Sequence, residues 1–304
     1  MSISGKREPQ LIVVPGRKGV GKTFETKKEI LEYCQALKRK VLILDSNNEY
    51  GDFQIINCDE NNIKLFSKQP RIEIRRVAPY TTNGNAKSTE DLKADMAVIL
   101  KNFKGGLVLL EDVNRYVGDS IGSDLIGSIV VLRHQDCDII LHYQGIGRIS
   151  HPKILMNTNL VRLAWTDDRV SRKASSFGDK VEILSIAEAI VSNKVETGLR
   201  MRKEFANKYP NFTSDPKKIK EYDDIFNKWC RFFLWISFDS QTIFGKFTKD
   251  EMKEGIFRYI SENSSDVLSP ELNKINRDGA KINKTPKEAI ISIENRLLDL
   301  YWGN

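Results

Sequence analysis

The sequence of 304 residues lacks long apolar runs, because its longest candidates are residues 11–15 and 232–238. A helix that spans a bilayer needs about 20 apolar residues, so we expect no membrane span. The first nine residues, Met-Ser-Ile-Ser-Gly-Lys-Arg-Glu-Pro, contain no apolar stretch, so we expect no secretory signal. The 4 cysteines lie far apart, without a Cys-x-x-Cys pair. A disulfide framework or zinc knuckle is therefore not expected, and a reducing, cytoplasmic compartment fits.

The composition is that of a globular protein with a buried core. Apolar residues make up 40% and charged residues 29% of the chain, which excludes collagen-like, low-complexity and wholly disordered chains. The length predicts about two domains. Lys and Arg number 48 against 41 Asp and Glu, a net charge of +7 that points only weakly to a polyanionic partner.

The chain up to about residue 175 alternates between apolar runs and helical periodicity. Apolar strands that alternate with helices are typical of a parallel sheet covered on both faces. Helices are predicted at residues 23–39 and 123–134, and after a cap at Ser88. Buried strands are predicted at residues 10–15, 41–45, 71–77, 107–110, 138–143 and 160–165.

The pattern changes after residue 175. A long helix is predicted at residues 181–209, and the polar residues 211–216 break the chain. We therefore expect one domain over residues 1–210 and a small, mostly helical domain over residues 211–304. The aromatic run at 232–238 is interpreted as a buried strand of that domain rather than a base-stacking surface. Helices are predicted there at residues 217–229, 249–261 and 286–301.

A complete phosphate-loop motif follows the first predicted strand. Glycines let the backbone amides turn toward the β- and γ-phosphates of a nucleotide, and the start of the next helix adds a positive dipole end. Lys22 is expected to bridge the β- and γ-phosphates, and the Thr23 hydroxyl to ligate Mg²⁺. An ordinary glycine turn is the alternative, and the flanking strand and helix argue against it. The motif G-x-x-x-x-G-K-[ST] is formed by Gly16, Arg17, Lys18, Gly19, Val20, Gly21, Lys22 and Thr23.

A second apolar strand, residues 107–110, ends in the acidic pair Glu111-Asp112. A phosphate-loop ATPase needs one carboxylate near Mg²⁺ and one that orients or deprotonates the attacking water. By position, Glu111 is expected to face the metal and Asp112 the water. The order Glu then Asp is the reverse of the usual one, which shifts each carboxylate by about one methylene. A polar strand end without function is the alternative.

Three further segments resemble the HerA/FtsK group of phosphate-loop motor ATPases. Residues 41–50 resemble that group's segment with an Asp, here Asp45, followed by Glu49-Tyr50. Residues 133–144 resemble its segment with an arginine before a strand and a glutamine at the strand's end. Residues 157–163 resemble its asparagine followed by an apolar strand. The resemblance covers roughly residues 10–175, and the phosphate loop is its most specific motif.

The resemblance implies an α/β fold: a RecA-like (ASCE) phosphate-loop core with a mainly parallel sheet between helices. It implies a homo-oligomeric ring, a pentamer or hexamer, that couples ATP hydrolysis to the translocation of nucleic acid. Gln144 would sense the γ-phosphate, and Arg133 as first choice or Arg148 as second would reach a neighbouring subunit's nucleotide. A surface-exposed arginine and a strand-end glutamine are the alternatives for these residues.

The short chain suggests which members of the group it resembles. The phosphate loop begins by residue 16, so we expect no N-terminal barrel or membrane region. This compactness is similar to the viral genome-packaging ATPases, which implies DNA, duplex DNA as first choice, and a portal or capsid vertex as partners in the host cytoplasm. The residues themselves do not distinguish duplex DNA, single-stranded DNA and RNA.

The basic residues support a nucleic-acid partner only as a group, because each alone is more often part of a solvated face. The histidines His134, His142 and His151 are not at metal-ligand spacing, and a core or surface position is expected for each. The clustered basic residues are Arg169, Arg172, Lys173, Lys194, Arg200, Arg202, Lys203, Lys217, Lys218 and Lys220.

Two other functions stay open. A nucleotide kinase or GTPase would use the same loop, although Asn227-Lys228 continues as Trp-Cys rather than as the guanine-reading Asn-Lys-x-Asp. An ATP-binding assembly or secretion factor is the third hypothesis, with hydrolysis weakened by the exchanged acidic pair.

Overall fold

The computed structural model describes residues 7–117, 123–149, 152–274 and 284–303. The chain forms two compact units, of which the first contains residues 1–162 and 166–168 and the second residues 163–165 and 169–304. The sequence placed the boundary at residue 210. The structure divides the chain earlier because the helix at residues 181–208 packs on helices of the second unit. A motor role for residues 1–210 and a docking role for residues 211–304 stay predictions.

The first unit is built on a parallel sheet with the strand order β3-β4-β2-β5-β6-β1-β7. The strands are β1 (Leu11–Pro15), β2 (Lys40–Leu44), β3 (Gln54–Ile55), β4 (Ile74–Val77), β5 (Gly106–Leu110), β6 (Asp138–Tyr143) and β7 (Leu160–Ala164). The six strands predicted from apolar runs are confirmed, although β4 begins three residues late, at Ile74. The short strand β3 was not predicted.

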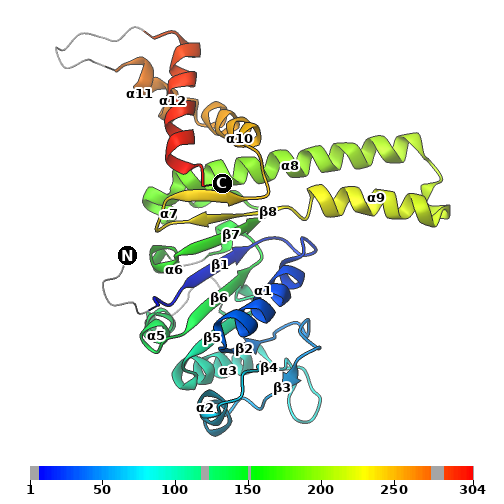
Figure 1. Cartoon of the computed structure of the whole chain (residues 1–304), viewed down its shortest axis with the longest axis vertical. Helices are drawn as coiled ribbons and strands as arrows, with labels where there is room; N and C mark the ends of the chain where they lie inside the picture. Colours follow the sequence, from blue (N-terminus) through cyan, green and yellow to red (C-terminus); the bar gives the residue numbers. More distant parts are fainter. Residues whose placement is uncertain (1–6, 118–122, 150–151, 275–283, 304) are drawn as a thin grey trace. The chain divides into compact units, whose positions relative to one another are not determined.

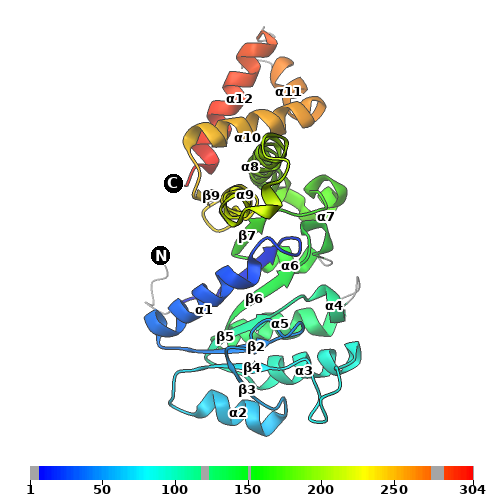
Figure 2. The same cartoon turned by 90° about the vertical axis from the view of Figure 1, so that its right-hand side faces the viewer.

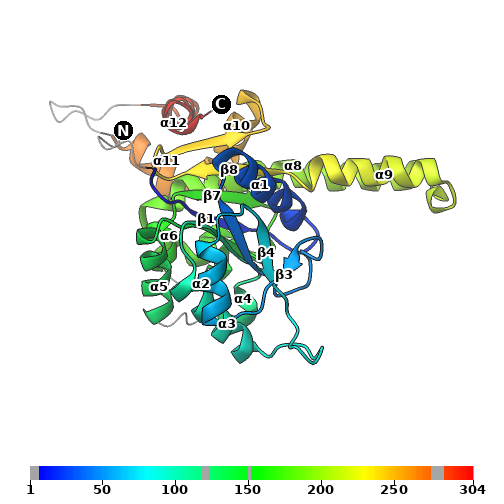
Figure 3. The same ribbon diagram turned by 60° about the horizontal axis from the view of Figure 1, so that its bottom comes forward.

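Every residue of β2, β5 and β6 is buried, as expected for strands covered on both faces. Ile30 of helix α1 packs with strand residues such as Val14, Ile43 and Leu109 in one core cluster. Figure 3 shows α1 on the opposite side of β1 from α5 and α6. The predicted α/β fold, with a mainly parallel sheet between helices, is thereby confirmed. The helices are α1 (Lys22–Leu37), α2 (Glu60–Lys68), α3 (Thr89–Asn102), α4 (Asn114–Val117), α5 (Ser123–His134) and α6 (Pro152–Asn157).

Strand order positions the sequence motifs. Because the strands run parallel, the carboxyl ends of β2, β5, β6 and β1 meet at one edge of the sheet. The phosphate loop follows β1, and Glu111 follows β5. The strands β1 and β5 are not neighbours, because β6 lies between them and pairs with both. The edge therefore presents, in spatial order, Asp45, Glu111, Gln144 and Gly16.

The second unit consists of helices and a two-stranded antiparallel hairpin of β8 (Phe233–Ser237) and β9 (Thr242–Gly245). The aromatic run is thus a strand with Leu234 and Ile236 fully buried, as predicted. Helices α8 (Val181–Lys208) and α9 (Pro216–Trp229) run side by side as a long helical hairpin (Figures 1 and 2). The other helices are α7 (Ala174–Phe177), α10 (Lys249–Glu262), α11 (Ser264–Leu272) and α12 (Pro286–Tyr301).

Within the described ranges, every helix is too short or too polar to cross a membrane.

Candidate nucleotide-binding site

The phosphate loop joins β1 to α1 through two glycines with positive φ. Gly19 has φ of +86° and Gly21 has φ of +90°, a region in which other residues are strained. The Gly16 amide donates to the Tyr143 carbonyl at the end of β6, 3.1 Å away, and holds the loop against the sheet edge. No side chain caps the start of α1 at Gly21. The amides of the first turn therefore offer a positive, hydrogen-bonding end to an anion.

The side chain of Lys22 curls back over the loop. Its Nζ donates to the carbonyl of Gly16 and, at 3.0 Å, to that of Arg17. Burial lowers the pKa of Lys22, and the nearby carboxylates of Asp112, Glu49 and Glu111 oppose that shift. The loop lysine thus lies close to the acidic strand end, as the motor hypothesis requires. Around it, Lys18 is exposed, Val20 is buried, and Arg17 forms an ion pair with Asp167 at 2.8 Å.

The two acidic residues after β5 have different surroundings. Glu111 is buried and accepts hydrogen bonds from the Asn47 backbone amide at 3.1 Å and from the Asn47 side chain at 3.3 Å. Burial, together with the charges of Glu49 and Asp45, raises the pKa of Glu111 to about 8. Asp112 has φ of +46° and accepts from Gln144 Nε2 at 2.9 Å. Its Oδ1 is buried and, among the described residues, has no hydrogen-bond partner.

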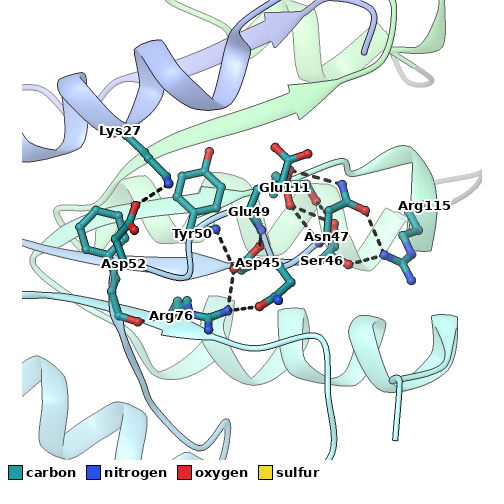
Figure 4. Close-up of polar contacts among 12 residues, drawn as sticks. Lys27, Asp45, Ser46, Asn47, Glu49, Tyr50, Asp52, Arg76, Glu111 and Arg115 are labelled. Atoms are coloured by element: carbon teal, nitrogen blue, oxygen red, sulfur yellow. Dashed lines mark hydrogen bonds and ion pairs between the residues drawn. The ribbon is translucent and has the colours of Figure 1, made fainter. Parts of the chain in front are cut away.

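The loop after β2, residues 45–50, forms the second wall of the site; we call it the β2 loop. Asp45 is fully buried, forms an ion pair with Arg76 at 2.8 Å, and accepts from the backbone amides of Glu49 and Tyr50. These bonds fix the loop (Figure 4). At its far end, the carboxylate of Glu49 accepts a hydrogen bond from the Thr23 hydroxyl.

The glutamine predicted to sense the γ-phosphate and the two arginines predicted to reach a neighbouring nucleotide do not all lie at the same edge of the sheet. Gln144 is exposed at the end of β6 and links Asp112 to Arg148, which donates to Gln144 Oε1 at 3.3 Å. Arg133 donates instead to the carbonyls of Pro9 and Asn157, at 3.2 and 3.1 Å. Because Pro9 precedes β1, Arg133 lies at the edge opposite the phosphate loop. The structure thus brings Gln144 and Arg148 to the site of their own chain, and it does not bring Arg133 there.

A buried polar network under α1 was not predicted. Arg162 of β7, 2% exposed, forms an ion pair with Glu29, and it donates to the Thr26 hydroxyl and to the Lys22 carbonyl. Thr26 also contacts His142 Nε2 at 2.9 Å. Burial and the charges of Arg162 and Lys22 hold the pKa of His142 well below its usual range. The only signal in the sequence was an arginine inside an apolar strand.

The histidines match their predicted settings where the structure describes them. His142 is buried in the core, and His134 is exposed at the end of α5. His151 lies outside the described residues.

The site's oxygen atoms fit Mg²⁺ bound together with a nucleotide. Thr23, Glu49, Glu111 and Asp112 supply hydroxyl and carboxylate oxygens, which are the ligands Mg²⁺ prefers. The partnerless Oδ1 of Asp112 is an orphaned acceptor beside them. In the described part of the chain, no three His, Cys, Asp or Glu side chains are grouped to hold a metal alone.

No family model matches the sequence, and no curated protein matches it either. Among solved structures, the chain is similar to the genome packaging NTPase B204 of Sulfolobus turreted icosahedral virus 2 with ATP-γ-S. The identity is 13%, the TM-score is 0.48, and 79% of this chain and 97% of that chain are covered.

The chain is also similar to B204, the DNA-packaging ATPase of Sulfolobus turreted icosahedral virus, at 15% identity and a TM-score of 0.43. There 78% of this chain and 97% of that chain are covered. The flagellar accessory protein FlaH of Methanocaldococcus jannaschii has 10% identity and a TM-score of 0.31, and covers 53% of this chain and 75% of that chain. With every TM-score below 0.5, these likenesses assign no function to this chain.

The raised pKa of Glu111 predicts a pH-dependent stability difference between wild type and Glu111→Gln. Between its ordinary value of 4.5 and about 8, folded Glu111 holds a proton that the unfolded chain releases. Rising pH in that window therefore destabilises the wild type, whereas glutamine does not ionise. We expect the variant to gain stability relative to wild type by up to about 1.4 kcal/mol per pH unit between pH 5 and 8.

Urea titrations followed by far-UV circular dichroism measure this difference; tryptophan fluorescence is unsuitable because Trp165, Trp229, Trp235 and Trp302 all belong to the second unit. Glu32→Gln, an exposed glutamate of α1, is the control and should show a constant difference. A constant difference for Glu111→Gln as well would contradict the prediction.

Proposed function

We propose that the chain is a Mg²⁺-dependent ATPase. One observation carries this proposal: the uncapped start of α1 and the Lys22 ammonium lie at the same sheet edge as the carboxyl groups of Glu49, Glu111 and Asp112. Amides and a lysine favour the phosphates of a nucleotide, and carboxylates near them favour a divalent cation. A site with both is suited to binding a nucleoside triphosphate with its metal.

The residues of the site divide the work of hydrolysis. Lys22 binds the β- and γ-phosphates through its ammonium group once it leaves the Gly16 and Arg17 carbonyls. Thr23 and a nearby carboxylate hold Mg²⁺, which when bound neutralises charge on the phosphates. Asp112 orients the attacking water, and Gln144, hydrogen-bonded to Asp112, reports the presence of the γ-phosphate. Arg148 is placed at the rim through Gln144.

We further propose that hydrolysis drives translocation of nucleic acid by a homo-oligomeric ring, with viral DNA packaging as the process. The motif order that resembles the HerA/FtsK group supports the ring. In such a ring, Arg133, at the sheet edge opposite the phosphate loop, would face a neighbouring subunit. That it reaches the neighbour's nucleotide stays a prediction. The sequence motifs and the surface charge support this proposal.

The end of the α8–α9 hairpin is the surface we assign to nucleic acid; we define this basic end as residues 200–220. It contains seven Lys and Arg residues against two acidic ones, Glu204 and Asp215. Lys203, Lys217 and Lys220 are exposed, and the part of the chain that the structure describes offers no ion-pair partner to them. Exposed cations can bind phosphates without regard to the base sequence of the nucleic acid.

Other predicted basic residues are engaged within the second unit and contribute less to this surface. Lys194 pairs with Glu251, and Lys218 pairs with Glu221 at 2.9 Å. Arg202 stacks on the Tyr222 ring with 3.9 Å to its centroid. These contacts stabilise the second unit. They also make the charges of Lys194, Lys218 and Arg202 less available to phosphates.

Lys22→Ala should reduce ATP hydrolysis by at least about 100-fold, because it removes the ammonium that binds the phosphates. The far-UV circular dichroism spectrum should stay unchanged, because Lys22 is the first residue of α1 and not part of the core. A coupled phosphate-release assay measures the turnover. Lys28→Ala, on the exposed side of α1, is the control and should retain full turnover. Unchanged hydrolysis in Lys22→Ala would remove the ATPase proposal, and tight ATP binding without turnover in the wild type would favour the assembly-factor hypothesis.

The triple variant Lys203→Ala, Lys217→Ala, Lys220→Ala should weaken binding to duplex DNA, single-stranded DNA or RNA, whichever the wild type binds. The slope of log K against log salt should decrease by about 0.7–0.9 for each phosphate that the variant no longer neutralises. Fluorescence anisotropy at several salt concentrations measures the slope. A matched triple variant at the exposed Lys246, Lys249 and Lys287 should leave it unchanged. Equal decreases in both variants would contradict the assignment of the basic end.

A further inference from the structure

Glu49 is presented to the phosphate loop by a loop that has little freedom. Its backbone amide donates to Asp45 Oδ1 at 2.9 Å, and the following residue, Tyr50, is fully buried and bonded to the same carboxylate. On the other side, Asn48 has φ of +59° and accepts from Arg76 at 2.8 Å. The backbone of Glu49 is therefore fixed from both sides, while its own side chain is exposed at the site.

The contact that Glu49 makes is with the metal-ligating hydroxyl of the loop motif. Thr23 Oγ1 donates to Glu49 Oε2. A hydroxyl has one hydrogen to donate and two lone pairs. With its hydrogen directed to Glu49, the lone pairs of Thr23 are left for a cation. Among the described residues, the structure records no hydrogen-bond donor for Glu49 Oε1.

Glu111, the residue the sequence assigned to the metal, is engaged elsewhere. Its Oε2 accepts from the Asn47 amide, with Ser46 Oγ at 3.4 Å, and its Oε1 accepts from Asn47 Nδ2. It is only 4% exposed, and the structure records no contact between it and Thr23. Both of its oxygens thus anchor the β2 loop that carries Glu49 (Figure 4).

We infer that Glu49 is the carboxylate that shares Mg²⁺ with Thr23, directly or through a metal-bound water, and that Glu111 positions the β2 loop. This inference rests on the proposed ATPase function. It also accounts for the exchanged Glu-Asp order, because a residue that anchors a loop is not required to have the reach of a metal ligand. Glu49 and Asp112 are also the two carboxylates with the largest electrostatic effect on Lys22, and a dication there would offset negative charge.

The test compares how strongly Mg²⁺ enhances ADP binding in wild type, Glu49→Gln and Glu111→Gln. Glutamine at 49 can still accept the Thr23 hydrogen bond but lacks the charge that favours a cation. ADP affinity is measured by isothermal titration calorimetry with Mg²⁺ and with EDTA. The readout is the ADP association constant with Mg²⁺ divided by the association constant with EDTA. We expect Glu49→Gln to lower this ratio at least tenfold with the EDTA value unchanged, and Glu111→Gln to lower it less.

The outcomes separate this inference from the function on which it rests. Glu32→Gln is the control and should keep the wild-type ratio, and thermal melts confirm that each variant is folded. A decrease in Glu111→Gln equal to or larger than that in Glu49→Gln would overturn the Glu49 assignment, while Mg²⁺-enhanced ADP binding by the wild type would leave the proposed function standing. A wild type that binds no ADP under either condition would overturn both.

Discussion

The parallel alignment of β2, β5, β6 and β1 is the constraint on which the rest of the structure depends. It brings four chain segments, far apart in sequence, to one edge of the sheet. The uncapped start of α1 and Lys22 give that edge a positive centre, and three carboxylates surround it. The uncapped helix start and Lys22 would bind the phosphates of a nucleotide, and the nearby carboxylates would bind its metal ion.

The acidic side of this edge depends on the buried Asp45–Arg76 pair. Removing charges from water is costly, so such a pair persists where additional hydrogen bonds satisfy it. Here Asp45 accepts hydrogen bonds from two backbone amides in addition to Arg76, and these bonds hold the β2 loop against β4. Glu111 anchors the same loop from β5. The local fold therefore uses buried polar groups to present Glu49 to Thr23, while Arg162 holds the first turns of α1 through the Lys22 carbonyl and Thr26.

Motifs that follow from local chemistry were predictable from the sequence, and contacts that join distant segments were not. Apolar runs predicted the strands, and the phosphate loop predicted the glycine turn and a helix that begins at Thr23, one residue after the observed start of α1 at Lys22. The role of Glu49 was not apparent because it depends on Arg76, which is 27 residues away and on another strand. Likewise, the neighbouring residues in the sequence do not indicate which of Arg133 and Arg148 lies near the phosphate loop. The direction of the strands decides this, because it places Arg148 at the edge with the loop and Arg133 at the opposite edge. The domain boundary was placed at a polar break inside a helical hairpin, because a turn between two packed helices resembles a linker in composition.

The central claim is that the loop at residues 16–23 binds the β- and γ-phosphates. The most direct measurement is the equilibrium affinity of the wild-type chain for ATP and for AMP, each with Mg²⁺, by isothermal titration calorimetry. Because the α-phosphate alone reaches few of the loop amides, we expect ATP to bind at least about 100-fold more tightly than AMP. Equal affinities for ATP and AMP would contradict the claim.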